Sequence, residues 1–321
     1  GTMKSFEYVQ ATEVSDAAQA GAVLKAGGVD LLGLVKERLL APDRVVSLLG
    51  IDALRQISGA KDGTRVGALV TLAELAAHEG VAASHVALGL AAAHTATPQV
   101  RNQATVGGNL LQRPRCWYFR NPDMRCLKRG GDTCLAQDGV NRYHAVFGND
   151  LCAIVHPSNI APALVALGAT VVLVGPDGER QVALEEFLTT PERDVARENA
   201  IRDGEVLTEI RVPEKGFRSA YLELRERQSF DWPLVTVAAA VRMKGGSVEE
   251  ASVVAGAVAP VPWRLKAVEE IVTGSDLDAG VLARAADASV KGAQPLAQNG
   301  YKLQQLRALV PRAIQLATRG A

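Results

Sequence analysis

The clustering of the cysteines constrains this chain more than any other feature of its sequence. All four of them, Cys116, Cys126, Cys134 and Cys152, fall in one short stretch, with the spacing C-x9-C-x7-C-x17-C. Thiolates gathered in this way suit a soft metal centre, either tetrahedral zinc or an iron–sulfur cluster. The close C-x2-C pair of zinc ribbons is absent. We therefore expect an iron–sulfur cluster that orders this stretch.

Cationic residues surround the four cysteines. Their positive charges would offset the negative charge of a thiolate-bound cluster. These cations are Arg113, Arg115, Arg120, Arg125, Lys128, Arg129 and Arg142. Two other interpretations of the cysteines remain open. Two disulfides are possible, although nothing else marks a small secreted scaffold, and unrelated buried thiols would not be expected to gather in one Arg-rich segment.

The overall composition is that of an ordinary globular protein with two or three domains. The chain has 321 residues, 48% of them hydrophobic, and a formal net charge of zero. The missing basic excess argues against nucleic-acid binding, and no apolar run reaches the roughly 20 residues of a membrane span. We interpret Gly1-Thr2 as an expression remnant before a start at Met3. Without a secretory segment we expect a cytoplasmic protein, or a periplasmic one if a signal-bearing partner exports it.

Hydrophobic periodicity predicts a mixed α+β chain. Strands are expected at 6–9, 45–48, 64–70, 170–174, 205–213, 219–226, 235–243 and 251–258. Helices are expected at 15–24, 71–77, 86–94, 159–168 and 183–188, and others beginning at 263, 277 and 302. Residues 112–153 lack periodicity and are predicted to be an ordered loop insertion. The change of pattern near residue 217 indicates a second, smaller α+β domain.

Two glycine pairs stand at predicted turns, in Ala26-Gly-Gly-Val-Asp and in Ala104-Thr-Val-Gly-Gly-Asn. Glycine allows positive φ and a close backbone approach to a ligand. Consecutive N–H groups in such turns form nests that bind anions such as a diphosphate. Neither segment is G-x-G-x-x-G or a P-loop. Each pair alone is an ordinary turn signal, but together they are compatible with two loops that hold one dinucleotide.

Several segments resemble the FAD-binding subunit of the xanthine dehydrogenase family of molybdenum hydroxylases. They run in order along almost the whole chain, and they begin at Lys25, Gly67, Gln99, Gly204, Gly256 and Asn299. The segment Arg115-Cys-Trp-Tyr-Phe-Arg looks like the branch typified by bacterial periplasmic aldehyde oxidoreductase, whose flavin subunit carries an additional [4Fe-4S] cluster. A comparable insertion occurs in 4-hydroxybenzoyl-CoA reductase, so it does not fix the substrate.

The resemblance implies a two-lobed FAD-binding fold of the vanillyl-alcohol-oxidase (PCMH) type followed by a C-terminal α+β flavoprotein domain. The FAD-binding domain would span 3–214, with a first lobe at 3–60 and a second lobe at 61–214 that contains the insertion at 112–153. The C-terminal domain would span 215–321.

The resemblance also assigns residues to cofactors. The diphosphate of FAD would be held by Ala26, Gly27, Gly28, Val29, Asp30, Leu31, Thr105, Gly107, Gly108 and Asn109. Ser158 and Asn159 would lie near the adenosine and Leu207 near the flavin or the adenine, with plain strand packing as the other interpretation of Leu207. Family members commonly have Asp where Asn159 stands. The [4Fe-4S] ligands would be Cys116, Cys126, Cys134 and Cys152.

Under this hypothesis the chain never touches the organic substrate. A molybdopterin-binding large subunit oxidises an aldehyde or N-heterocycle, and a [2Fe-2S] small subunit passes electrons to FAD here, for delivery to an external acceptor. We expect no catalytic acid or base, and we interpret the five histidines as surface or structural. Trp117, Tyr118 and Phe119 would shield the cluster, while Trp232 and Trp263 are expected in the core or an interface. The competing hypotheses are a self-contained FAD oxidoreductase and a zinc-stabilised scaffold.

Overall fold

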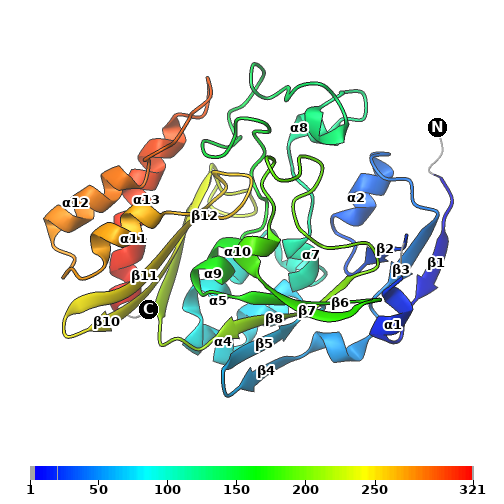
Figure 1. Cartoon of the computed structure of the whole chain (residues 1–321), viewed down its shortest axis with the longest axis horizontal. Coiled ribbons are helices and arrows are strands. Elements are labelled where there is room, and N and C mark those ends of the chain that lie inside the picture. The colour runs from blue at the N-terminus through cyan, green and yellow to red at the C-terminus, as the bar shows by residue number, and fades with distance from the viewer. Residues whose placement is uncertain (1–3, 20, 320–321) are drawn as a thin grey trace.

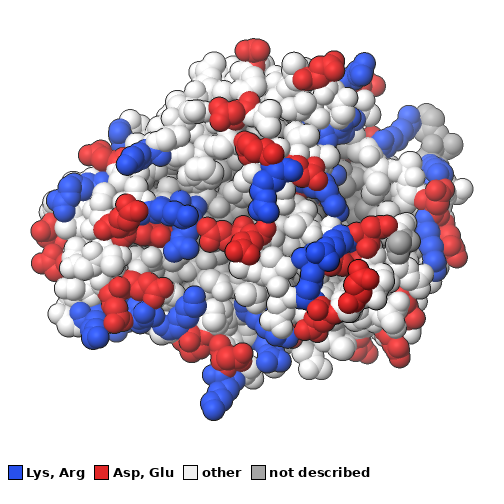
Figure 2. All heavy atoms as spheres, in the orientation of Figure 1, with Lys and Arg blue, Asp and Glu red and all other residues white. Residues whose placement is uncertain are grey.

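The protein is described by a computed structural model that covers residues 4–19 and 21–319. Residues 1–3, the proposed expression remnant and start, lie outside the described residues, as do residue 20 and residues 320–321. The expected outer bounds of the two domains, residues 3 and 321, therefore also lie outside them. Three separate sheets organise the described chain (Figure 1). Positive and negative side chains are interspersed on the face shown in Figure 2, in keeping with the zero net charge.

The first sheet is small and parallel, in the order β1-β3-β2. Its strands are β1 (Glu7–Gln10), β2 (Val23–Lys25) and β3 (Arg44–Ser47). The accompanying helices are α1 (Val14–Ala17), α2 (Leu31–Lys36) and the 3-10 turn η1 (Asp52–Arg55). The apolar residues of β3 pack inward against those of η1, because Val46 and Leu54 are both buried in one cluster.

The second sheet has five antiparallel strands in the order β4-β5-β8-β6-β7. They are β4 (Ile57–Ala60), β5 (Gly63–Gly67), β6 (Thr170–Gly175), β7 (Gly178–Ala183) and β8 (Val206–Pro213). The helices of this part are α3 (Leu72–Ala77), α4 (Glu79–Ser84), α5 (Val86–His94), α6 (Pro98–Arg101), α7 (Val106–Leu110), α9 (Ile160–Ala166) and α10 (Leu184–Phe187). The core of this part lies between the sheet and α3, α5 and α9.

The third sheet belongs to the C-terminal part and has the order β12-β11-β10-β9. Its strands are β9 (Arg218–Leu224), β10 (Val235–Lys244), β11 (Ser247–Gly256) and β12 (Trp263–Arg264), and its helices are α11 (Lys266–Val272), α12 (Ala279–Ala288) and α13 (Tyr301–Arg319). Strand β10 contacts α13 as well as α5 and α9. Apart from Thr236, it is therefore apolar without alternation from Val235 to Val241, as expected of a strand buried on both faces.

Most predicted elements are present, and α3 illustrates the local sequence signals that identified them. Thr71 accepts a hydrogen bond from the Glu74 N–H at 3.1 Å, and the Glu74 carboxylate accepts one from the Thr71 N–H at 2.8 Å. This capping box is legible in the sequence. The helix expected at 15–24 is wrong, because α1 ends at Ala17 and Val23–Lys25 form a strand beside β3. Gly21 has φ +75°, which no right-handed helix allows.

Besides β2 and β12, two further strands were not predicted. β4 and β7 are edge strands with mostly exposed side chains, so they lack the apolar alternation that identifies a strand. β4 pairs with β5 across the expected boundary between the lobes at residue 60. The helix expected from Trp263 begins only at Lys266, because Trp263 and Arg264 pair with β11 as β12.

The cysteine insertion, residues 112–153, contains only the short helix α8 (Trp117–Arg120) and the 3-10 turn η2 (Leu127–Arg129). In Figure 1 its loops stand above α7 and α10, between α2 and the C-terminal helices. Hydrogen bonds join it to both neighbours, as from Arg120 to Asp30 of the first lobe and from Lys302 of α13 to Tyr143. The predicted ordered loop is therefore found, and tertiary contacts rather than regular structure order it.

Candidate functional site

The first glycine pair forms the loop between β2 and α2. Gly27 is required because a Cβ there would lie 1.8 Å from the carbonyl oxygen of Gln103. Gly28 has φ +76°, the left-handed conformation that favours glycine. Among the described residues, the N–H groups of Gly27, Gly28 and Val29 donate to no protein acceptor. This loop therefore offers the anion-binding backbone that we predicted, although a strand precedes it and not the expected helix.

The second glycine pair is the first turn of α7 and not a free turn. Thr105 caps this helix by accepting the Gly108 N–H at 3.1 Å. The N–H groups of Val106 and Gly107 donate to the carbonyls of Val70 and Ala68, so no second nest is available. A Cβ at Gly107 would lie 2.9 Å from that of Ala68. Within this segment only Gly108 is exposed, so it presents a Cα that carries no side chain.

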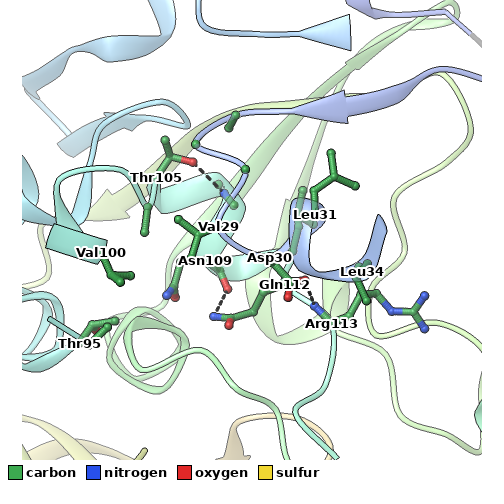
Figure 3. Close-up of a pocket in the computed structure, with 18 of the residues that line it drawn as sticks. Val29, Asp30, Leu31, Leu34, Thr95, Val100, Thr105, Asn109, Gln112 and Arg113 are labelled. Atoms are coloured by element: carbon green, nitrogen blue, oxygen red, sulfur yellow. Dashed lines mark hydrogen bonds between the residues drawn. The ribbon is translucent and has the colours of Figure 1, made fainter. Parts of the chain in front are cut away.

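The two glycine segments face each other across a cavity of about 530 Å³ (Figure 3). Its lining includes Ala26, Gly27, Gly28, Val29, Asp30, Leu31, Thr105, Gly107, Gly108, Asn109, Asn159 and Leu207. Ser158 stands behind the wall, and its hydroxyl donates to Asn109 Oδ1 at 2.5 Å. Leu207 belongs to β8 and is buried, so both interpretations of this residue hold: it packs in the strand and it lines the cavity.

The cavity also has walls that sequence reasoning missed. The loop between β9 and β10 contributes Phe230, Asp231 and Trp232, and the loop after α5 contributes Thr95 to Thr97. Trp232 does not lie in the core, because this side chain is 49% exposed and its ring lies 5.1 Å from the Arg115 guanidinium. Its other expected place, an interface, stays a prediction. Its position in a polar turn, between Asp231 and Pro233, is the signal that indicated exposure. Trp263 stacks on buried Phe147, as expected for a core residue.

The carboxylate of Asp30 is directed at the cysteine insertion. Its Oδ1 lies 2.6 Å from Arg120 Nη2 and 3.0 Å from Arg115 Nη2. Its Oδ2 accepts the Arg113 backbone N–H at 2.8 Å, the contact drawn in Figure 3. Asp30 therefore lines the cavity, and its negative charge is paired with Arg115, which lines the same cavity, and with Arg120.

The four cysteines converge although they lie far apart along the insertion. Cys116, Cys126, Cys134 and Cys152 line one small cavity, and none forms a disulfide. Burial raises the pKa of Cys116 to about 11. A hydrogen bond between the thiols of Cys134 and Cys152 lowers the pKa of Cys134 and raises that of Cys152. Among the described residues, no group of three or more His, Cys, Asp or Glu side chains could hold a metal ion.

The surroundings of the thiols are rich in donors. The Ala153 N–H donates to Cys134 Sγ at 3.5 Å, and His144 Nε2 lies 3.2 Å from Cys116 Sγ. Burial lowers the pKa of His144 to about 4, which keeps the ring neutral at pH 7. His144 therefore has a place beside the thiols that we did not predict. Phe119 and Tyr118 line this cavity, whereas Trp117 is exposed.

The motif that begins at Asn299 holds this histidine in place. The Asn299 side-chain amide donates to the carbonyls of His144 and Ala145 at 3.1 and 3.0 Å. Lys302 Nζ donates to Tyr143 O at 3.0 Å, and Tyr301 Oη to Arg142 O at 2.9 Å. Burial lowers the pKa of Lys302 to about 7. The C-terminal part thus fixes residues 142–145 through their carbonyl oxygens.

A buried ion pair closes the other side of the cysteine cavity. Lys128, which lines it, lies 2.7 Å from Glu198, and both side chains are almost fully buried. Arg113 also pairs with Glu198, at 2.6 Å. The remaining buried histidines are structural, as expected: His85 contacts the Thr64 hydroxyl at 3.0 Å, and His156 is enclosed.

Comparisons with known proteins place this geometry in a family. Residues 4–215 match the family described as the FAD binding domain in molybdopterin dehydrogenase, and residues 219–317 match the CO dehydrogenase flavoprotein C-terminal domain. The chain therefore belongs to the FAD-binding subunits of the molybdopterin dehydrogenases. It is an FAD-dependent oxidoreductase subunit, and the expected fold class, a flavin-binding part followed by an α+β flavoprotein domain, is confirmed.

Individual relatives agree with this assignment. The chain is 36% identical to the aldehyde oxidoreductase FAD-binding subunit PaoB of Escherichia coli, over 94% of each chain. It is 28% identical to the carbon monoxide dehydrogenase medium chain of Hydrogenophaga pseudoflava, over 97% of this chain and 96% of the relative. A solved structure of carbon monoxide dehydrogenase from that organism covers both chains completely, with a TM-score of 0.77 and 27% identity. No helix among the described residues is long and apolar enough to cross a membrane.

Proposed function

We propose that this chain is the FAD- and [4Fe-4S]-carrying electron-transfer subunit of a molybdenum hydroxylase of the aldehyde or xanthine dehydrogenase type. Its partners would be a molybdopterin-binding large subunit and a [2Fe-2S] small subunit, with an external acceptor as the outlet. The observation that carries the proposal is the juxtaposition of a dinucleotide-sized cavity and a four-thiol cavity within one family member. The chain would lie in the same cellular compartment as its partners.

FAD fits the larger cavity for structural reasons. The free N–H groups of Gly27 to Val29 suit a diphosphate, and the exposed Cα of Gly108 leaves room for a close approach. Asn159 and Leu207 line the same space and supply one polar and one apolar wall. When bound, FAD supplies the two-electron chemistry, while the protein supplies position and electrostatics.

The smaller cavity suits a cluster better than a single ion. A zinc ion needs every thiolate about 2.3 Å from one point, and no ready single-ion site exists among the described residues. A [4Fe-4S] cubane leaves its thiolates roughly 6 to 7 Å apart. The four thiols line one cavity without disulfides, with the Ala153 N–H at Cys134, the His144 ring beside Cys116 and the buried cation Lys128 nearby, and these features support a cluster. The ligands would be Cys116, Cys126, Cys134 and Cys152.

The test is co-purification of the full chain with its natural partners, followed by analysis for molybdenum, iron and flavin. The proposal predicts that the complex contains all three and oxidises aldehydes, while the lone chain has no aldehyde activity and still passes electrons from an artificial donor to a dye. Robust aldehyde oxidation by the lone, molybdenum-free chain would overturn it in favour of a self-contained flavin enzyme. A complex that reduces an aromatic acyl-CoA instead would point to the 4-hydroxybenzoyl-CoA reductase type.

A further inference from the structure

We propose that the cysteine insertion is a retention device for the flavin, and that Arg115 and Arg120 act on the flavin loop through Asp30. The inference deepens the proposed function and rests on the FAD site described above. Asp30 is one residue beyond Gly27 to Val29, whose N–H groups are free for the diphosphate. Whatever fixes Asp30 therefore fixes the end of that loop.

Among the described residues, every polar contact of the Asp30 carboxylate comes from the insertion. Arg120 donates a hydrogen bond to Oδ1 at 2.6 Å, Arg115 forms an ion pair with Oδ1 at 3.0 Å, and the Arg113 N–H donates to Oδ2 at 2.8 Å. The side chains of Asp30 and Arg120 are only 15% and 12% exposed. Charge-assisted hydrogen bonds at such shielded positions are stronger than exposed ion pairs. The loop is therefore anchored by residues 83 or more positions away in sequence.

Arg120 spans the whole of α2. Its guanidinium bonds Asp30 before the helix and lies 3.6 Å from Glu37 after it. Between these two contacts, Gly33 brings its backbone close, since a Cβ there would lie 3.9 Å from Arg120 Nη1. The guanidinium is itself fixed, because its Nε donates to Pro114 O at 2.8 Å. The flavin loop and α2 are thus held to the insertion as one unit.

Arg115 joins three parts of the molecule. It contacts Asp30, donates to Gln112 Oε1 at 3.1 Å and lies over the Trp232 ring, and it directly precedes Cys116. The two arginines also neutralise Asp30, whose charge would otherwise repel a diphosphate bound by the adjoining N–H groups. If they are removed, the loop loses its anchor and the site gains an unpaired negative charge.

The experiment measures the rate at which the purified, FAD-loaded full chain releases flavin, from the rise of free-flavin fluorescence on dilution. We expect Arg120→Ala and Arg115→Ala to accelerate release by about tenfold or more, within the range of coupled charged neighbours. Arg312→Ala is the matched control, because Arg312 is an exposed arginine outside the insertion. It should release flavin at the wild-type rate.

A double variant distinguishes the effect of the Asp30 charge on flavin release from an effect of misfolding. In Arg120→Ala the Asp30 carboxylate keeps only Arg115 as a cationic partner. Adding Asp30→Asn removes this partly compensated charge, so the double variant should release flavin more slowly than Arg120→Ala alone. Arginine variants that retain FAD as the wild type does, or a double variant that is no slower, would overturn the inference. If the wild-type chain binds no FAD at all, the proposed function fails instead, so the two failures are distinguishable.

Discussion

The flavin cavity and the cysteine cavity are neighbours built on opposite principles. The flavin cavity is large, and the glycines after β2 and in the first turn of α7 let backbone approach it closely. The cysteine cavity is small and walled by side chains, and its geometry depends on donors from remote segments such as Asn299 and Lys302. The flavin cavity depends on the insertion through the anchoring of Asp30, whereas the cysteine cavity lies within the insertion and depends on everything that holds it.

The strongest test of this contrast is the loss of one thiol. We expect Cys134→Ser to abolish bound iron while the three sheets stay folded, because a four-ligand centre loses one of its thiolates. Its flavin release should accelerate as the insertion loosens from Asp30. Iron analysis and circular dichroism check the first two expectations. Met124→Ala, an exposed change in the same insertion, is the control and should keep its iron. Undiminished iron in Cys134→Ser would remove this residue from the ligand set.

Gly108 tests the backbone site in the same way. Gly108→Val puts a Cβ 3.0 Å from Thr105 Oγ1 and fills part of the cavity, so we expect FAD affinity to fall by more than about tenfold with the fold retained. Gly59→Val on β4 is the matched control, since a Cβ at Gly59 meets no atom within 4 Å. Titration of flavin-free protein with FAD measures both. Stoichiometric FAD in Gly108→Val would contradict the placement of this glycine at the cofactor.

A substitution at Asn299 tests whether the two cavities depend on the same supporting contacts. Asn299→Ala removes one donor from each of the carbonyls of His144 and Ala145, which we expect to lower the free energy of unfolding by about 2 kcal/mol. Iron retention should fall more than FAD binding. Denaturant titration and iron analysis provide the readout, with exposed Lys291→Ala as control. Equal losses of iron and FAD would show that the two cavities share their support.

His156 lies on the chain segment between the two cavities and gives the smallest effect. Burial lowers the pKa of His156 from 6.5 to about 4. Between these two pH values the ring stays neutral in the folded state but binds a proton in the unfolded chain. The stability that it contributes is present above pH 6.5 and is lost as the pH falls toward 4. Denaturant titrations between pH 7 and pH 4 should show a shallower decline for His156→Gln than for the wild type. Parallel declines would exclude His156 as a source of acid sensitivity.

Local signals in the sequence located part of the flavin cavity. The glycine pairs that contain Gly27 and Gly108 line it, and Thr71 with Glu74 caps α3 as predicted. The pairing of Asp30 with Arg120 joins residues 90 positions apart, which no local pattern encodes. The same reason explains the missed strands β4 and β7, which carry no apolar alternation.

The most direct test of the account is a cofactor inventory of the wild-type full chain, purified without oxygen. It predicts one FAD, four irons and four acid-labile sulfides per chain, with a flavin spectrum over a broad cluster shoulder that bleaches on reduction. One zinc ion per chain, or flavin with no iron, would contradict a cluster at Cys116, Cys126, Cys134 and Cys152.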